Sequence, residues 1–166
     1  THATAYPPLL GRRSLKRNRT PLEEAAHYGH EDVAMALIEL GSDVPAHAAA
    51  ALGLTEVVSA IVDADPSQLE ARDDSEDTPL MAACTHGRVE TARALLDAGA
   101  DANAENRWAA TALTRAVAAS DTQTVELLLS VGVDPAKPGR GGMLPVDHIA
   151  TPDASVATRL RALLGA

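Results

Sequence analysis

The chain has few of the residues that build an aromatic or cross-linked interior. It holds one cysteine, no phenylalanine, two tyrosines and one tryptophan in 166 residues. A single cysteine excludes an internal disulfide and is compatible with a reducing compartment, so we expect a cytoplasmic protein, with a secreted or periplasmic protein as the alternative. The scarcity of aromatic residues leaves alanine, leucine and valine to form the core, and such a core packs by close approach of helices.

The chain also has few long apolar runs, and it has few cationic residues after residue 19. No stretch approaches the roughly 18 apolar residues of a membrane span, so we expect no membrane partner. All 23 acidic residues and nine of the 14 cationic residues follow residue 19, so residues 20–166 carry a net formal charge of −14. Affinity for phosphate backbones comes chiefly from Lys and Arg, which argues against nucleic acid. An acidic body favours a protein partner with a basic surface.

Residues 1–19 differ from the rest of the chain. Pro7, Pro8 and Gly11 precede a basic run without any acidic residue, which predicts an extended lead-in. This basic arm either touches an acidic partner or is a solvated segment. The chain begins with Thr1 and not with Met, which is compatible with processing or with a piece of a longer protein.

The segment TPLMAACTHGRVETARALLDAGADAN, from Thr78 to Asn103, predicts two short helices. Thr78 can cap the first helix, and Pro79 suits the first helical position, where its missing N–H would be unsatisfied anyway. We expect Gly87 to end this helix in the left-handed conformation and Gly99 to end the second helix. Because neither helix can bury its apolar stripe alone, the pair must pack against neighbouring pairs.

Looser copies of this segment make the chain a repeat protein. Gly29, Gly53 and Ser120 occupy the position of Gly87, and a second marker follows 12 residues later in every copy. The first marker advances by 24, 34 and 33 residues from copy to copy, and a fifth, degraded copy begins at Leu144. An apolar pair precedes each second marker: Leu37 and Ile38, Ile61 and Val62, Leu95 and Leu96, Leu128 and Leu129.

These copies resemble the ankyrin repeat, which has a period of about 33 residues and a TPLH-x-A signature. The resemblance is carried by TPLEEAAHYGH, PAHAAAALGL, TPLMAACTHGR and TALTRAVAASD, and it covers residues 20–166. It implies an all-α solenoid of about five helix-turn-helix repeats with short β-hairpin fingers. The Ala-rich, Lys-poor and Phe-free composition further resembles bacterial stand-alone ankyrin-repeat proteins.

The repeat phase predicts the domain organisation. We expect a basic lead-in at 1–19 and an ankyrin-repeat domain at 20–166, with repeats at about 20–44, 45–73, 74–106, 107–139 and 140–166. The connection between Gly41 and Pro45 is too short for a finger, so the first inter-repeat hairpin should be missing. In the fourth repeat, Ala112 and Ser120 replace the usual proline and glycine.

The resemblance also implies a function and a surface. Partners of ankyrin proteins usually bind the concave face, made by the finger tips and by the two residues before the glycine of each first helix. This implies a protein-protein interaction module without cofactor, metal or catalytic residue, acting as an adaptor, an inhibitor or an immunity-type neutraliser. Its implied contact residues are Lys16, Arg17, Arg19, His27, Tyr28, Leu52, Asp74, Ser75, Asp77, Thr85, His86, Arg107, Trp108, Arg140 and Met143.

Trp108 is the residue best suited to binding. A Trp at a finger tip does not contribute to the core, and Trp and Arg are enriched among binding hot spots. The alternative is that Trp108 folds over a neighbouring finger as packing. The acidic connector at 63–77 is likewise either a solvated charge cluster or a docking site for a basic partner.

Catalytic and metal-binding interpretations have weaker support. Cys84 stands where an alanine points inwards, which predicts a buried, inert thiol. Glu23, His27 and His30 have a helical spacing that suits metal ligands, but the repeat phase explains His30 and His47 as structural hydrogen-bonding residues. Two alternatives stay open: a small-molecule binder or enzyme that uses the gap between repeats one and two, and a domain that packs in cis within a longer chain.

Overall fold

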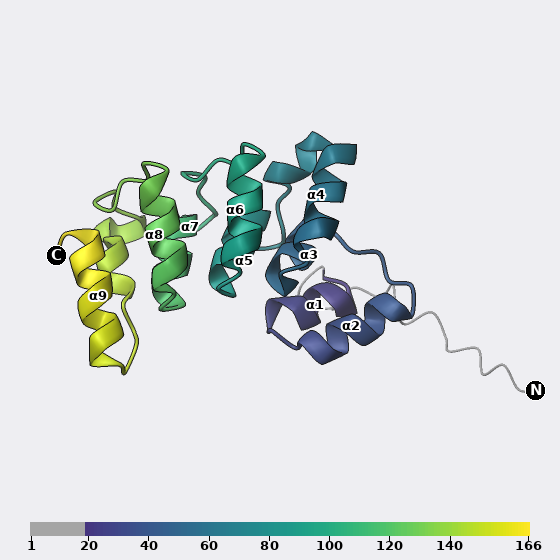
Figure 1. Cartoon of the computed structure of the whole chain (residues 1–166), viewed down its shortest axis with the longest axis horizontal. Helices are drawn as coiled ribbons and strands as arrows, with labels where there is room; N and C mark the ends of the chain where they lie inside the picture. Colours follow the sequence, from purple (N-terminus) through teal and green to yellow (C-terminus); the bar gives the residue numbers. More distant parts are fainter. Residues whose placement is uncertain (1–18) are drawn as a thin grey trace, which may run out of the picture.

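The computed structural model describes residues 19–166, apart from the side chain of Arg140. The expectations for the lead-in, including the contact roles of Lys16 and Arg17, lie outside the described residues. The described chain is a row of stacked helix pairs (Figure 1). Its helices are α1 (Pro21–His27), α2 (Glu31–Glu39), α3 (Ala46–Leu52), α4 (Thr55–Ala64), α5 (Pro79–Thr85), α6 (Val89–Asp97), α7 (Ala112–Ala118), α8 (Thr122–Ser130) and α9 (Ala154–Leu164), with 3₁₀ turns η1 (Pro66–Glu70), η2 (Arg140–Gly142) and η3 (Pro145–His148).

The third pair, α5 and α6, forms as its sequence predicts. Thr78 caps α5 by accepting a hydrogen bond from the backbone N–H of Met81, and Pro79 is the first helical residue. Gly87 and Gly99 follow the two helices with φ of +64° and +99°. Glycine adopts this left-handed backbone conformation without steric strain because it has no Cβ, so the chain can reverse after each helix.

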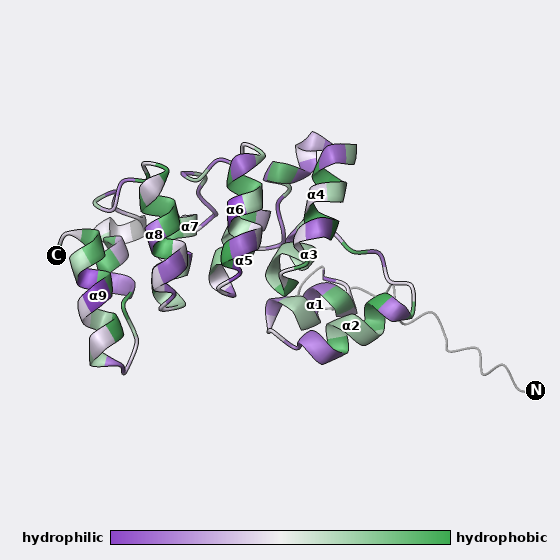
Figure 2. Ribbon diagram, in the orientation of Figure 1, coloured by the Kyte–Doolittle hydropathy of each residue, from purple (hydrophilic) through white to green (hydrophobic). Residues whose placement is uncertain are grey.

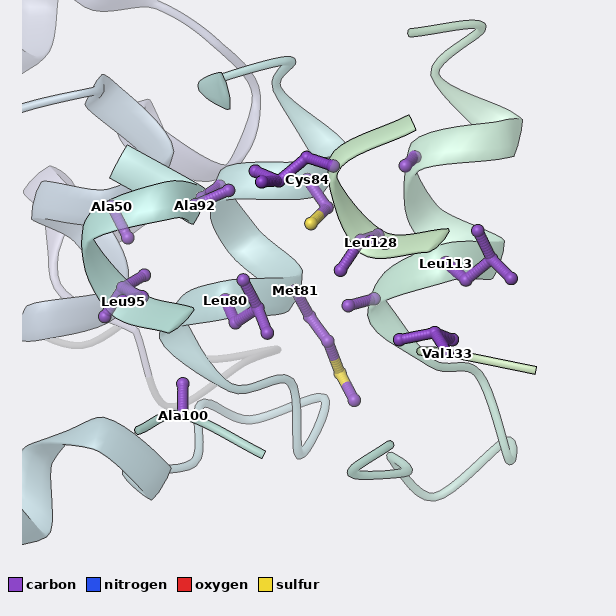
Figure 3. Close-up of a cluster of buried hydrophobic side chains, with 14 of the residues drawn as sticks. Ala50, Leu80, Met81, Cys84, Ala92, Leu95, Ala100, Leu113, Leu128 and Val133 are labelled. Carbon is purple, nitrogen blue, oxygen red and sulfur yellow. The ribbon is translucent and has the colours of Figure 1, made fainter. Parts of the chain in front are cut away.

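The apolar side chains form two cores. The larger core is continuous from α3 to α9, and Figure 3 shows Leu80, Met81 and Cys84 of α5 within it, together with Leu113 of α7 and Leu128 of α8. The smaller core joins α1 and α2 to α3. Cys84 is fully buried as expected, and burial raises the pKa of its thiol, which keeps the thiol protonated and unreactive.

Three tight turns recur at 33-residue steps and form the fingers, at residues 73–77, 106–110 and 139–143. In each turn the first residue donates its N–H to the carbonyl of the fifth, and the fourth residue has a positive φ: Glu76, Ala109 and Gly142. No residue between 19 and 166 forms a β-strand, so the implied β-hairpins exist here as hydrogen-bonded turns.

The first helix pair joins the array differently from the others. Residues 41–45 connect α2 to α3 without a turn of the finger type. The second helices α4, α6, α8 and α9 pack on one another in a row, whereas α2 packs mainly on α1 and lies across the row in Figure 1. In Figure 2 hydrophobic and hydrophilic segments alternate along α2 and α4. The exposed apolar side chains there are Val33 of α2, Leu40 at the end of α2 and Val57 of α4.

The last repeat is shortened. The 3₁₀ turn η3 stands in the place of a first helix and packs on α7, while α9 closes the row by packing on α8. None of the helices in residues 19–166 has the length and hydrophobicity needed to cross a lipid bilayer.

Candidate functional site

The predicted contact residues come from the first helices of the repeats and from the finger turns. Helices α1, α3, α5 and α7 pack in succession, each against the next, so the residues at their ends come into line. The finger turns follow in the same order. The predicted contact residues therefore lie on neighbouring repeats, but they divide into buried and exposed groups.

Arg19 belongs to the buried group. Only 2% of its surface is exposed, and its Nη2 donates to Asp73 Oδ2 at 2.7 Å and to the hydroxyl of Ser75 at 3.2 Å. The start of the first repeat is thereby joined to the finger turn at 73–77, across the place where the first finger is missing. We assign Arg19 to the framework of the surface and not to its exposed contacts.

Asp77 is also buried, with 6% of its surface exposed. Its carboxylate accepts hydrogen bonds from Arg115 Nη2 at 2.7 and 2.9 Å and from the side-chain amide of Asn106 at 2.6 Å. One carboxylate thus ties together the fingers at 73–77 and 106–110 and helix α7. Leu52, another predicted contact residue, is buried in the smaller core, where α1 packs on α3.

Basic side chains fasten each finger to its neighbour. Arg72 donates to the backbone carbonyl oxygens of Glu76 and Glu105, at 2.9 and 3.0 Å. Arg107 returns from the second finger to the backbone carbonyl of Asp74, and Lys137 forms an ion pair with Glu105 at 2.7 Å. These contacts hold the finger tips in one register.

Trp108 lies at the tip of the second finger with 45% of its surface exposed. Its backbone N–H donates to Asn106 Oδ1 at 2.9 Å, and the guanidinium of Arg107 lies 5.2 Å from the centre of its ring. This distance is within the range of a cation–π contact. The indole therefore lies beside Arg107 at the tip, while almost half of the surface of Trp108 faces solvent.

The other predicted contact residues lie at the ends of α1 and α5 and in the last finger. His27 and Tyr28 follow one another at the end of α1, with ring centroids 5.0 Å apart, and Tyr28 is exposed. Thr85 donates its hydroxyl to the carbonyl of Met81, and burial lowers the pKa of His86. Met143 closes the last finger and is exposed.

A small cavity of about 40 Å³ lies between side chains of the first four repeats. Glu23 of α1 accepts a hydrogen bond from His47 Nε2 of α3 at its edge, over 3.1 Å. This contact, opposed in part by burial, lowers the pKa of Glu23 from 4.5 to about 2, so the carboxylate is ionised at neutral pH. The cavity is lined by Arg19, Glu23, Ala26, His27, His47, Ala48, Ala51, Asp73, Asp77, Ala82, Thr85, His86 and Arg115.

Sequence reasoning missed Asn106 and Arg115 as parts of this surface. A signal for Asn106 was present, because Asp73 and Asn106 open equivalent turns 33 residues apart. In both turns the side-chain oxygen accepts the backbone N–H groups of the third and fifth residues, as Asp and Asn often do in turns. Nothing in the local sequence indicates that Arg115 reaches Asp77.

Within residues 19–166, no three or more His, Cys, Asp or Glu side chains gather in a way that could hold a metal ion. Glu23 and His30, two of the residues considered for metal binding, have separate surroundings: Glu23 contacts His47, and the ring of His30 lies 6.4 Å from that of Tyr28.

Comparison with known proteins adds two family matches. A family model of three ankyrin repeats matches residues 46–139, and a model of a single ankyrin repeat matches residues 17–46. The matched residues include the three helix pairs from α3 to α8 and the helices α1 and α2.

Two curated proteins are similar over part of the chain. The serine/threonine-protein kinase VIK of Arabidopsis thaliana is 40% identical over 75 residues, which are 45% of this chain and 17% of the kinase. The 2-5A-dependent ribonuclease of Mus musculus is 42% identical over 71 residues, which are 42% of this chain and 10% of the ribonuclease. The matched segment is therefore less than a fifth of either relative.

Proposed function

Because the chain belongs to the ankyrin-repeat family, whose repeats are generally protein-protein interaction modules, we propose that it binds a protein partner through its inner face and finger tips. The contact surface consists of the exposed tip residues of the second and last fingers and the exposed end of α1. Its described side chains are Tyr28, Arg107, Trp108 and Met143. This surface is supported by three buried residues: Arg19, Leu52 and Asp77.

The observation that carries the proposal is the exposure of Trp108 beside Arg107. Its ring is held by Arg107, which is itself anchored on Asp74 of the neighbouring finger. An aromatic anchor of this kind loses little conformational entropy on binding, since a Trp side chain has only two rotatable bonds. Trp and Arg together are the side chains most enriched in binding hot spots.

The charge of the repeat region supports a partner with a basic surface. Residues 20–166 carry a net formal charge of −14, and complementary charge speeds encounter and disfavours partners of like charge. An adaptor, an inhibitor that occupies a basic site and a neutraliser of a cationic toxin all fit this surface.

A small organic ligand in the gap between repeats one and two has less support. The cavity that borders this gap is about 40 Å³, whereas sites for drug-sized ligands and cofactors span roughly 300–1,000 Å³. The relatives' kinase and ribonuclease names describe proteins of which the matched segment is a minor part, so they supply no argument for catalysis here.

The test is quantitative capture of a partner on immobilised protein, comparing wild type with Trp108→Ala. We expect the variant to lose a partner that wild type retains, with an affinity at least about tenfold lower, because hot-spot truncations cost roughly 2 kcal/mol or more. The captured partner is then purified and its dissociation constant measured by calorimetry.

Leu40→Ala is the matched control, since Leu40 is also an exposed apolar side chain but lies at the end of α2, away from the finger tips. The control should bind as wild type does, and circular dichroism should show equal helicity for all three proteins. A partner lost with Leu40→Ala and kept with Trp108→Ala would contradict the proposed surface.

A further inference from the structure

The second helices α2, α4, α6 and α8 carry equivalent residues, four positions after the left-handed residue that follows each first helix. These residues are Val33, Val57, Thr91 and Thr124. Thr91 and Thr124 are fully buried, and the hydroxyl of Thr91 shares a hydrogen bond of 2.7 Å with Thr55 of the preceding second helix, α4. Val33 and Val57 are 48% and 39% exposed, so no preceding helix of the described chain covers them.

The exposure of Val57 extends along one side of α4, which we call the α4 flank. It consists of Val57, Ala60, Ile61 and Ala64, whose three- and four-residue spacing places them on one side of the helix. Ile61 is half-buried and the other three are exposed, whereas Leu95 of α6, the equivalent of Ile61, is fully buried. In a regular row α2 would cover this flank, but α2 packs mainly on α1 and lies across the row (Figure 1).

The charge around the α4 flank indicates what chemistry fits it. Residues 20–71 hold ten acidic residues and no Lys or Arg. Two exposed acidic residues, Glu56 and Asp63, lie on α4 itself, four and three residues from Ala60, so they border the flank. Arg88 of α6 is already paired with Glu31 of α2. A second copy of the chain would bring the same acidic residues to this surface, whereas a basic partner complements them.

We propose that the α4 flank binds an amphipathic helix of a partner protein, whose apolar stripe is bordered by Lys or Arg. The helix packs beside α4 as α4 packs beside α6, with apolar anchors at three- and four-residue spacing. Helix α4 runs from Thr55 to Ala64, about 15 Å, which matches about three turns of a partner helix. The flank contains none of the finger-tip residues, so this second surface does not rest on the proposed function.

The probe is a capped peptide of about 15 residues with Leu at three-to-four spacing and Lys beside the Leu stripe, because shorter isolated helices are marginal in water. The backbone amides of the full chain are followed by ¹H–¹⁵N NMR during a titration at constant ionic strength. We expect saturable shifts at Val57, Ala60 and Ile61. Saturable shifts confined to other helices or to the fingers, or no saturable shift, would overturn the proposal.

Two matched peptides test the chemistry of the partner helix. One has Glu in place of every Lys, and the other has Gln in place of every Leu and keeps the charge. We expect both to bind at least about tenfold more weakly than the Leu/Lys peptide. Equal binding of the Gln/Lys peptide would mean that charge alone attracts the probe, and equal binding of the Leu/Glu peptide would reject a basic partner.

Val57→Lys places a charge in the middle of the apolar flank and should weaken binding of the Leu/Lys peptide at least about tenfold. Val131→Lys is the matched control, because Val131 is also an exposed valine but lies at the end of α8, and the change in net charge is the same. The control should bind the peptide as wild type does, and circular dichroism should show equal helicity. Equal weakening in both variants would mean that binding follows net charge and not the α4 flank.

Two further measurements exclude other occupants of the flank. Sedimentation equilibrium should give the mass of a monomer, and a dimer that Val57→Lys dissociates would assign the flank to a second copy. If the basic lead-in of the same chain holds this place, the peptide should bind only after the lead-in's four cations, Arg12, Arg13, Lys16 and Arg17, are replaced by Gln. Either result would overturn the proposal.

The peptide titration also separates this proposal from the proposed function. Trp108→Ala should bind the Leu/Lys peptide as wild type does, because Trp108 lies at a finger tip and not on α4. Loss of peptide binding in Trp108→Ala would place the peptide on the finger tips and reject the α4 flank as its site. A failure to capture any partner through Trp108 would end the proposed function alone, because the peptide titration does not depend on that partner.

Discussion

Ser120 holds a backbone conformation that glycine adopts at the equivalent positions of the other repeats. Its φ is +60°, beside +72°, +75° and +64° at Gly29, Gly53 and Gly87. In this region a residue with a Cβ destabilises the folded state by roughly 1–2 kcal/mol relative to glycine. Glycine offsets about 0.4–1 kcal/mol of this difference, because it makes the unfolded chain more flexible. We therefore expect Ser120→Gly to raise the free energy of unfolding by about 0.5–1 kcal/mol, measured by urea denaturation.

Gly87→Ala is the reverse change at an equivalent position and should destabilise by a similar or larger amount. An added Cβ there would also meet the Asp121 carboxylate at 3.4 Å. If Ser120→Gly lowers stability, the serine side chain contributes more than the strain of its backbone.

Glu23 makes stability depend on pH. Its folded pKa is about 2, against an ordinary value of 4.5, chiefly because His47 donates a hydrogen bond to the carboxylate. The group therefore contributes its full stabilisation above about pH 4.5, and this contribution is lost as the pH falls toward 2. Glu23→Gln, which retains a capping amide at this helix start, should be less stable than wild type at pH 7 and should lose less stability on acidification.

Urea denaturation of both proteins at pH 7, 4 and 3 measures this difference. Glu126→Gln, which alters an exposed carboxylate paired with Arg159, serves as the control and should follow the wild-type pH dependence. Parallel curves for wild type and Glu23→Gln would mean that Glu23 keeps an ordinary pKa in the folded protein.

At the scale of elements, the fingers depend on one buried carboxylate. Removing the Asp77 side chain would leave Arg115 Nη2 and the Asn106 amide without the acceptor that joins two fingers to α7. Loss of one member of a buried pair costs roughly 3–5 kcal/mol, and the partial exposure of Arg115 lowers this cost, so we expect Asp77→Ala to destabilise by about 2–4 kcal/mol. Glu126→Ala breaks an exposed ion pair and should cost less than about 1 kcal/mol. Equal losses would mean that the finger contact is not structural.

The elements themselves could be predicted because they depend on local residues repeated in phase. The bounds of α5 follow from local signals: Thr78 and Pro79 begin the helix, and Gly87 follows its end. The short connection at 41–45 likewise leaves no residues for a finger. The burial of Arg19 and Leu52 could not be predicted in the same way. It results from α1 packing on α3 and from Asp73, 54 residues away, which are contacts without a local signal.

At the scale of the whole molecule, stability in a repeat array comes from contacts between neighbouring repeats. The row of second helices is continuous from α4 to α9, and Thr55 and Thr91 share a hydrogen bond of 2.7 Å between α4 and α6. Helix α2 packs mainly on α1. An ion pair between Glu31 and Arg88 holds its first turn, but an exposed pair of this kind adds roughly 0–1 kcal/mol and does not replace a packed neighbour.

We therefore expect α2 to open at a lower free energy than the rest of the array, and native-state hydrogen exchange measures this directly. Helix α9 is the internal control, because it also stands at an end of the array but packs on α8. If ends open merely because they are ends, the amides of α2 and α9 should exchange equally fast. If packing on a neighbouring second helix determines the opening free energy, the amides of α2 should exchange at least about tenfold faster than those of α9, a difference of roughly 1.4 kcal/mol. The amides of α6 should then exchange most slowly. Protection of α2 equal to that of α6 would mean that the first repeat is stabilised by contacts other than those in the row.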